Sequence, residues 1–218
     1  MIISRGRSYV FVHIPKTGGT SLAMALENRA MKDDLLIGDT PKARRRKRRL
    51  QGLQARGRIW KHATLADIDG ILTPEELAGM FTFTLVRNPW DRVVSYYHWL
   101  KEQQFAHPSV VTAKRRPFDG FLTDRHIRES LRHSPASSYM RDVTGVERCR
   151  SFIRLERLEA DLAPLQEHLG FCLEIPHENR SARESDYRHH YSPTLRDIVA
   201  DVCAEDIARF GYRFDDFG

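Results

Sequence analysis

The sequence has few cysteines and lacks any long hydrophobic run. Its 218 residues include three cysteines, Cys149, Cys172 and Cys203, which are far apart and odd in number. Such usage argues against a disulfide framework and favours a reducing compartment. No stretch of about 18 apolar residues is present, and the N-terminal MIISRGRS has no apolar signal-peptide core. We therefore expect a cytoplasmic protein without a transmembrane segment.

The excess of positive charge is confined to one segment. The formal net charge is +6, and the run Arg44–Arg49, with one lysine, carries as many positive charges by itself. This pattern is typical either of a solvated surface segment or of an electrostatic site for an anionic ligand. The run has no interleaved aromatic residues on which bases would stack, so nucleic acid is not an expected partner.

The length and composition fit one α/β domain. A chain of 218 residues that is 41% hydrophobic can bury a sizeable core. We expect a single domain over residues 1–218, with a basic insertion at about 41–58. Leucines at three- and four-residue steps from Leu155 to Leu169 predict a core helix that Pro164 kinks or divides. A last helix is expected from Pro193 to Phe210, ended by Gly211.

Residues 9–21, YVFVHIPKTGGTS, have the pattern of a strand, a turn and a helix that together bind an anion. Tyr9–Ile14 reads as a buried strand, and apolar residues at helical spacing follow the turn. In the turn, two glycines allow close backbone approach, and the N–H groups at a helix start attract anions. The lysine precedes both glycines, unlike the order GxxxxGK[ST], which disfavours an ordinary ATP site. Lys16, Thr17, Gly18, Gly19, Thr20 and Ser21 make up this turn.

Residues 81–100, FTFTLVRNPWDRVVSYYHWL, repeat the arrangement. Phe81–Val86 reads as a second buried strand, with Asn88 as a helix N-cap and the following proline as the first helical residue. Arg87 then lies at the carboxyl end of the strand. Ser95 lies roughly 9 Å along the helix axis, so one phosphate could meet both side chains. By itself such a pair favours a structural arginine and a solvated or packed hydroxyl, and it is the presence of the first motif that favours a second anion site.

Together, HIPKTGGTS and LVRNPWDRVVSYY resemble the 5′-phosphosulfate-binding and 3′-phosphate-binding motifs of carbohydrate-type sulfotransferases. The resemblance is to the family that includes heparan sulfate 2-O-sulfotransferase and its shorter bacterial members. It extends to the segments WKHATLADI, SFIRLERLEADL, PHENRS and EDIARFGY. It implies a central parallel sheet flanked by helices, a P-loop-like nucleotide site, and sulfuryl transfer from 3′-phosphoadenosine 5′-phosphosulfate (PAPS) to a hydroxyl.

The resemblance also implies roles for individual residues. Residues 16–21 would hold the 5′-phosphosulfate end of PAPS, and Lys16 would act in catalysis. Arg87 and Ser95 would hold the 3′-phosphate, and Ser181 would touch the nucleotide. His62, which spacing alone would leave as a core or surface histidine, would be the catalytic base. The acceptor would be a carbohydrate, such as a glycan or glycolipid, and the enzyme a bacterial one.

The chemistry agrees with these implications, and two other functions stay open. PAPS is anionic at both ends and needs two cradles, and the chain offers two. A sulfuryl group carries less negative charge than a phosphoryl group, so a lysine and helix N–H groups suffice without a metal ion. One alternative is a nucleotide-dependent kinase of related fold. The other is a non-catalytic basic protein that binds nucleic acid.

Overall fold

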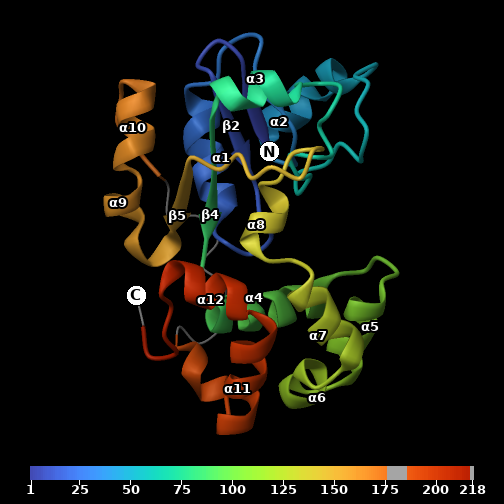
Figure 1. Ribbon diagram of the computed structural model, residues 1–218. Coiled ribbons are helices and arrows are strands. Elements are labelled where there is room, and N and C mark those ends of the chain that lie inside the picture. Colours follow the sequence, from blue (N-terminus) through green and yellow to red (C-terminus); the bar gives the residue numbers. More distant parts are fainter. Residues whose placement is uncertain (176–185, 217–218) are drawn as a thin grey trace. The chain divides into compact units, whose positions relative to one another are not determined.

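The computed structural model describes residues 1–175 and 186–216. These residues form two compact units (Figure 1). The first unit contains residues 1–86 and 136–175 and includes the sheet. The second contains residues 87–135 and 186–216 and is helical.

The sheet of the first unit has five strands in the order β3-β1-β2-β4-β5. Its strands are β1 (Ile2–Ser4), β2 (Tyr9–Val12), β3 (Leu35–Leu36), β4 (Phe81–Val86) and β5 (Ser151–Arg154). β2, β4 and β5 run parallel, which confirms the predicted α/β fold with a central parallel sheet. β1 is antiparallel to both β2 and β3, so the sheet is mixed. The tight turn at Ser8, with a φ of 52°, joins β1 to β2 in a way the sequence reading did not anticipate.

Alternating side chains of the strands build a core on each face of this sheet. On one face, Tyr9 and Phe11 of β2 pack with Leu22 and Leu26 of α1 (Gly19–Asn28). The same cluster includes Leu165 of α10 (Ala163–Leu169). In Figure 1, α10 and α9 (Leu158–Asp161) lie beside β5. Pro164 lies in the first turn of α10, which is separate from α9, so the predicted core helix is divided near this proline.

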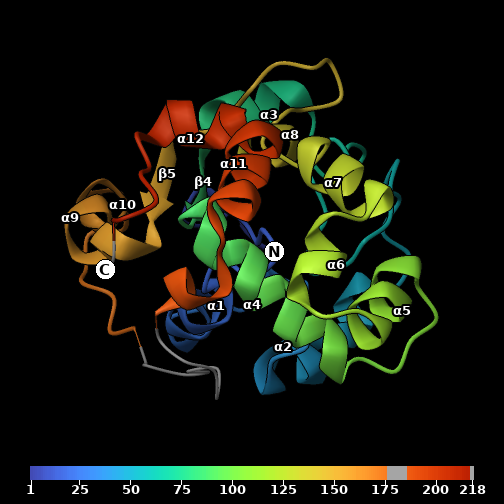
Figure 2. The same cartoon turned by 90° about the horizontal axis from the view of Figure 1, so that it is seen from below.

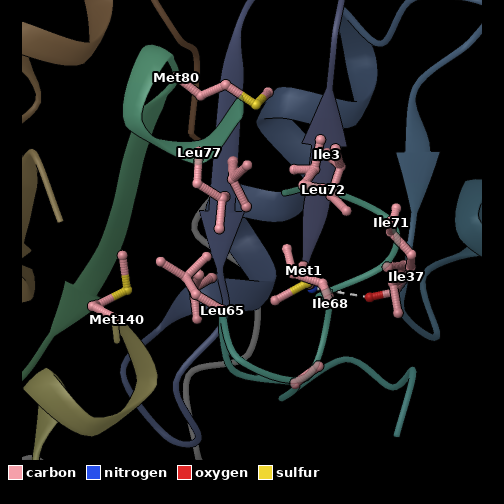
Figure 3. Close-up of a cluster of buried hydrophobic side chains, with 13 residues drawn as sticks. Met1, Ile3, Ile37, Leu65, Ile68, Ile71, Leu72, Leu77, Met80 and Met140 are labelled. Atoms are coloured by element: carbon pink, nitrogen blue, oxygen red, sulfur yellow. Dashed lines mark hydrogen bonds between the residues drawn. The ribbon is translucent and has the colours of Figure 1, made fainter. Parts of the chain in front are cut away.

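The opposite face is covered mainly by irregular chain between residues 50 and 72. Val10 and Val12 of β2 belong to this cluster. Figure 3 shows Leu65, Ile68 and Leu72 gathered near Ile3 and Met1, with Leu77 from α3 (Pro74–Gly79) beside them. α8 (Ala136–Tyr139) leads into Met140 of the same cluster. The basic run lies on α2 (Pro41–Arg46) and the 3₁₀ helix η1 (Lys47–Leu50), and it is exposed except for Arg46, which is half-buried.

The second unit consists of helices packed around aromatic side chains. Its helices include α4 (Pro89–Glu102), α5 (Pro108–Arg115), α6 (Phe118–Leu122), α7 (Arg125–Arg132), α11 (Pro193–Val202) and α12 (Ala204–Phe210). Figure 2 shows α5, α6 and α7 grouped together, and they contact one another. Tyr97 of α4 packs against Phe118 and Phe121 of α6. The predicted single helix from Pro193 to Phe210 was wrong, because the chain breaks at Cys203 between α11 and α12.

Within residues 1–175 and 186–216, we find no helix with the length and apolarity required to cross a bilayer.

Candidate active site

The turn between β2 and α1 has the backbone shape of an anion cradle. The strand ends at Val12, two residues earlier than predicted, and the turn leads into α1 at Gly19. Lys16 and Gly18 both adopt left-handed conformations, with φ of 66° and 82°, and Thr17 between them does not. Alternation of left- and right-handed residues turns successive N–H groups toward one concave side, where an anion is bound. A left-handed lysine is costly, and such strain is concentrated at functional sites.

The start of α1 also lacks the side-chain cap that other long helices have. Gly18 is its N-cap and offers no side chain to the first N–H groups. Among described helices of eight residues or more, α1 is alone in this: α4, α5, α7 and α11 are capped by Asn88, His107, Asp124 and Ser192. Uncapped N–H groups need another hydrogen-bond partner, and a ligand phosphate supplies one.

His13 explains why the turn contains Gly19. A Cβ atom at Gly19 would lie 2.4 Å from Cδ2 and 2.7 Å from Nε2 of His13. The His13 side chain is buried, with 8% of its surface exposed, so it has little room to move. Gly18 is constrained by its φ and by the side chain of Leu155. From the sequence, both glycines were predicted to allow the backbone to approach the anion. The role of His13 was missed, because nothing in the spacing of the run HIPK indicates that its side chain packs against Gly19.

The hydroxyl of Thr17 forms a hydrogen bond to the backbone of the turn. Its Oγ1 donates to the carbonyl oxygen of Ile14 at 2.9 Å, and the side chain is buried. The single hydroxyl proton is therefore engaged within the turn, and Thr17 shapes the cradle. Thr20 and Ser21 lie in the first turn of α1, where their side chains are half-buried.

His62 is joined to the cradle through His13. Its Nδ1 lies 2.7 Å from the carbonyl oxygen of His13, and the two imidazole rings meet edge to face at 4.8 Å. Because a carbonyl oxygen only accepts, Nδ1 carries the proton, and Nε2 of the neutral ring keeps a lone pair. The structure therefore brings the predicted base and the predicted 5′-cradle together within one unit.

The surroundings keep both histidines neutral. Burial lowers the pKa of His62 to about 4, although the hydrogen bond to His13 opposes this effect. The nearby charge of Lys61 lowers the pKa of His62 further. Burial also holds the pKa of His13 well below its usual value. At neutral pH, His62 is therefore an unprotonated imidazole with a fixed tautomer, which is the form that accepts a proton.

Arg87 and Ser95 belong to the second unit. Asn88 caps α4 by accepting from the N–H of Trp90, as predicted, and Pro89 is the first helical residue. The Nε of Arg87 donates to Oδ2 of Asp91, four residues later, at 2.7 Å. This hydrogen bond fixes the orientation of the guanidinium. Ser95 lies further along α4 and is buried, with 6% of its surface exposed. Asp91 thus orients Arg87, a role that the sequence reading did not assign.

The comparison with family models identifies the chain. The model described as the sulfotransferase family matches residues 1–213. The chain belongs to the sulfotransferase family. It is therefore an enzyme that transfers a sulfuryl group from PAPS. No curated protein matches it. A solved structure, mouse sulfotransferase SULT7A1 complexed with PAP, aligns over 94% of this chain and 85% of its own, with 14% identity and a TM-score of 0.46.

Other predicted features of this sulfotransferase lie elsewhere. Ser181 and the whole PHENRS segment, residues 176–181, lie outside the residues that the structure describes. In the described part of the chain, no group of three or more His, Cys, Asp and Glu side chains is arranged to ligate a metal ion. The three cysteines are free thiols.

Proposed function

We propose that this sulfotransferase sulfates a hydroxyl of a carbohydrate, with His62 as the base that activates the hydroxyl. One observation carries this proposal: the Nδ1–H of His62 is held by the carbonyl of His13, beside the phosphate cradle. The remaining nitrogen, Nε2, is the only one able to accept a proton. A base held this close to the cradle can serve an acceptor bound next to the donor.

In the proposed reaction, the acceptor oxygen attacks the sulfur of PAPS and loses its proton to Nε2 of His62. The bond between sulfur and the 5′-phosphate oxygen breaks, which leaves 3′-phosphoadenosine 5′-phosphate (PAP). Lys16 and the N–H groups at the start of α1 stabilise the charge that develops on the leaving phosphate. Gly18, Gly19, Thr20 and Ser21 complete the cradle, and Thr17 holds its shape through Ile14.

The low pKa of His62 in the free chain fits this sequence of events. A ring that is neutral at every physiological pH is ready to accept a proton before the donor binds. The negative charge of bound PAPS favours the imidazolium form, so its arrival raises the pKa of His62 and makes the ring a stronger base. The donor thereby prepares the base for the acceptor.

Recognition of the donor's other end is assigned to Arg87 and Ser95. This assignment rests on the resemblance of LVRNPWDRVVSYY to the 3′-phosphate motif. It is supported by the ion pair with Asp91, which holds the guanidinium of Arg87 in one orientation. A fixed guanidinium binds phosphate in a bidentate manner at a low cost in side-chain entropy. Ser181 is assigned to the nucleotide on the resemblance alone.

The experiment that tests the proposal is calorimetric titration with PAP, AMP and ATP in a buffer containing EDTA. We expect PAP to bind without metal and more tightly than either other nucleotide, because PAP alone fills both phosphate sites. Equal affinity for PAP and AMP would overturn the assignment. Tight ATP binding that requires a divalent ion would favour a kinase instead.

A further inference from the structure

Two exposed side chains, Arg58 and Trp60, precede His62 in the chain. Along residues 58–60, exposure alternates: Arg58 and Trp60 are exposed, and Ile59 between them packs against the core. Trp60 exposes 39% of its surface, which is unusual for so large an apolar side chain. Its ring meets the ring of His62 edge to face at 5.1 Å. An exposed indole therefore borders the base.

Arg58 covers this indole and has no ionic partner among the described residues. Its guanidinium lies 5.0 Å from the centre of the Trp60 ring. The neighbouring cation Lys61, by contrast, bonds through its Nζ to Asp39 at 2.7 Å. A guanidinium on an aromatic ring, without a carboxylate beside it, is a ready partner for an anionic group.

The segment that carries the pair is fixed in place. The N–H of Arg56 donates to the carbonyl of Asp69, and the N–H of Gly57 donates to the carbonyl of Asp67, both at 2.9 Å. A Cβ atom at Gly57 would lie 2.7 Å from the Cα of Asp67. The two backbone segments therefore approach too closely for any residue other than glycine at position 57. Arg58 and Trp60 are thus presented to solvent by a backbone that is anchored on one side by hydrogen bonds and on the other by Ile59.

We propose that Arg58 and Trp60 bind the acceptor and select a sugar that carries a carboxylate or sulfate group. The inference rests on the proposed role of His62, because it places the acceptor against that residue. The sugar ring lies against the exposed indole, and its anionic group pairs with Arg58. One hydroxyl of the bound sugar then faces Nε2 of His62. A neutral sugar can lie against the indole of Trp60 but has no anionic group to pair with Arg58.

The test is calorimetric titration of the protein, saturated with PAP, with a glucuronate-containing tetrasaccharide. The reference ligand is the same tetrasaccharide with its carboxyl groups reduced to alcohols. We expect the carboxylate form to bind roughly ten- to a hundredfold more tightly, as a charge-assisted contact implies. In Arg58→Gln this preference should vanish, and in Trp60→Leu both ligands should bind roughly fivefold or more weakly.

The chain offers matched control variants. Arg29 is exposed, and its guanidinium lies 5.1 Å from the ring of Phe171 in the same kind of contact. Arg29→Gln makes the same charge change, and Phe171→Leu the same kind of aromatic loss, away from His62. We expect both controls to bind the two tetrasaccharides as the parent does. If Arg29→Gln lowers the preference as much as Arg58→Gln, the effect belongs to the overall charge and the proposal fails.

Failure of this inference and failure of the proposed function give different results. PAP affinity reports on the donor site and involves neither Arg58 nor Trp60. If PAP binds as expected but the tetrasaccharides bind equally, or Arg58→Gln retains the preference, the acceptor assignment is overturned and the donor site stands. If PAP does not bind, the proposed function itself fails.

Discussion

The Nδ1 atom of His62 lies 2.7 Å from the carbonyl oxygen of His13, the residue whose ring fills the space beside Gly19. One buried residue therefore touches both halves of the proposed chemistry. Its backbone fixes the tautomer of the base, and its side chain restricts the cradle to glycine. His62 follows His13 by 49 residues in the sequence, and their hydrogen bond joins the base to the segment that leads into the cradle.

Replacing the base should separate turnover from donor binding. His62→Ala is expected to lower turnover by roughly 10²–10⁴-fold, because general base catalysis contributes that much. Its affinity for PAP should stay nearly unchanged. Lys16→Ala should weaken PAP binding and turnover together, because the role proposed for Lys16 is to contact the donor both when it binds and when its phosphate leaves. Calorimetry with PAP measures the donor affinity of each variant, and initial rates with a confirmed acceptor measure its turnover. Full activity in His62→Ala would mean that another group removes the proton.

Acid should destabilise the protein through His62. The pKa is about 4 in the folded chain and 6.5 in the unfolded one, so between these values the unfolded chain binds an extra proton. The stabilising contribution is therefore present above pH 6.5 and is lost as pH falls toward 4, at a cost of up to about 2–3 kcal/mol.

Urea denaturation of the parent and of His62→Gln, from pH 7 to pH 4, measures this contribution. The glutamine can still donate to the His13 carbonyl but does not titrate, so the variant should lose less stability over this range. His126→Gln removes an exposed histidine and should follow the parent. Identical slopes in His62→Gln and the parent would contradict the pKa assignment.

The contact between Gly19 and His13 should make the cradle intolerant of a methyl group. Gly19→Ala is expected to lose PAP affinity and about 1–3 kcal/mol of stability, because the buried His13 ring cannot yield. Gly79→Ala is the control, since a Cβ atom there has nothing within 4 Å. The cost of Gly19→Ala should shrink when it is combined with His13→Ala. Additive costs in that double-mutant cycle would show that the two residues do not interact.

Arg87 should confer the preference for a 3′-phosphate. We expect PAP to bind the parent better than AMP, and Arg87→Ala to lower this ratio roughly ten- to a hundredfold. Arg125 forms the same type of pair, four residues before Glu129, in the same unit. Arg125→Ala should keep the parent's ratio. The assignment of the 3′-phosphate to Arg87 would be untenable if its variant discriminated as well as the control.

Much of this arrangement could be predicted because local sequence determines it. The strand Phe81–Val86 and the Asn88 cap were predicted from short patterns and are confirmed. The separation of two helices at Pro164 and the end of the last helix at the left-handed Gly211 are confirmed in the same way. In each case a local feature determines where a helix begins or ends: the missing N–H of a proline, a capping side chain or a glycine in a left-handed conformation.

The features that were missed depend on residues far apart in the sequence. The antiparallel pairing of β1 involves only three residues, too few to show a period. His13 and His62 meet only after β2 and the segment at residue 62 are packed together. No local pattern distinguishes Trp60 in the sequence, and its exposure is seen only in the folded chain. Long-range contacts of this kind leave no local pattern to read.

The position of the basic run has a consequence for self-association. α2 and η1, which carry the run, pack against β3, the two-residue strand at one edge of the sheet. An uncovered edge invites another chain to add a strand, and short strands and positive charge are known deterrents. Two copies approaching by this edge would bring two sets of like charges together and would repel each other. The like charges on α2 and η1 therefore oppose the addition of a strand from a second copy at this edge.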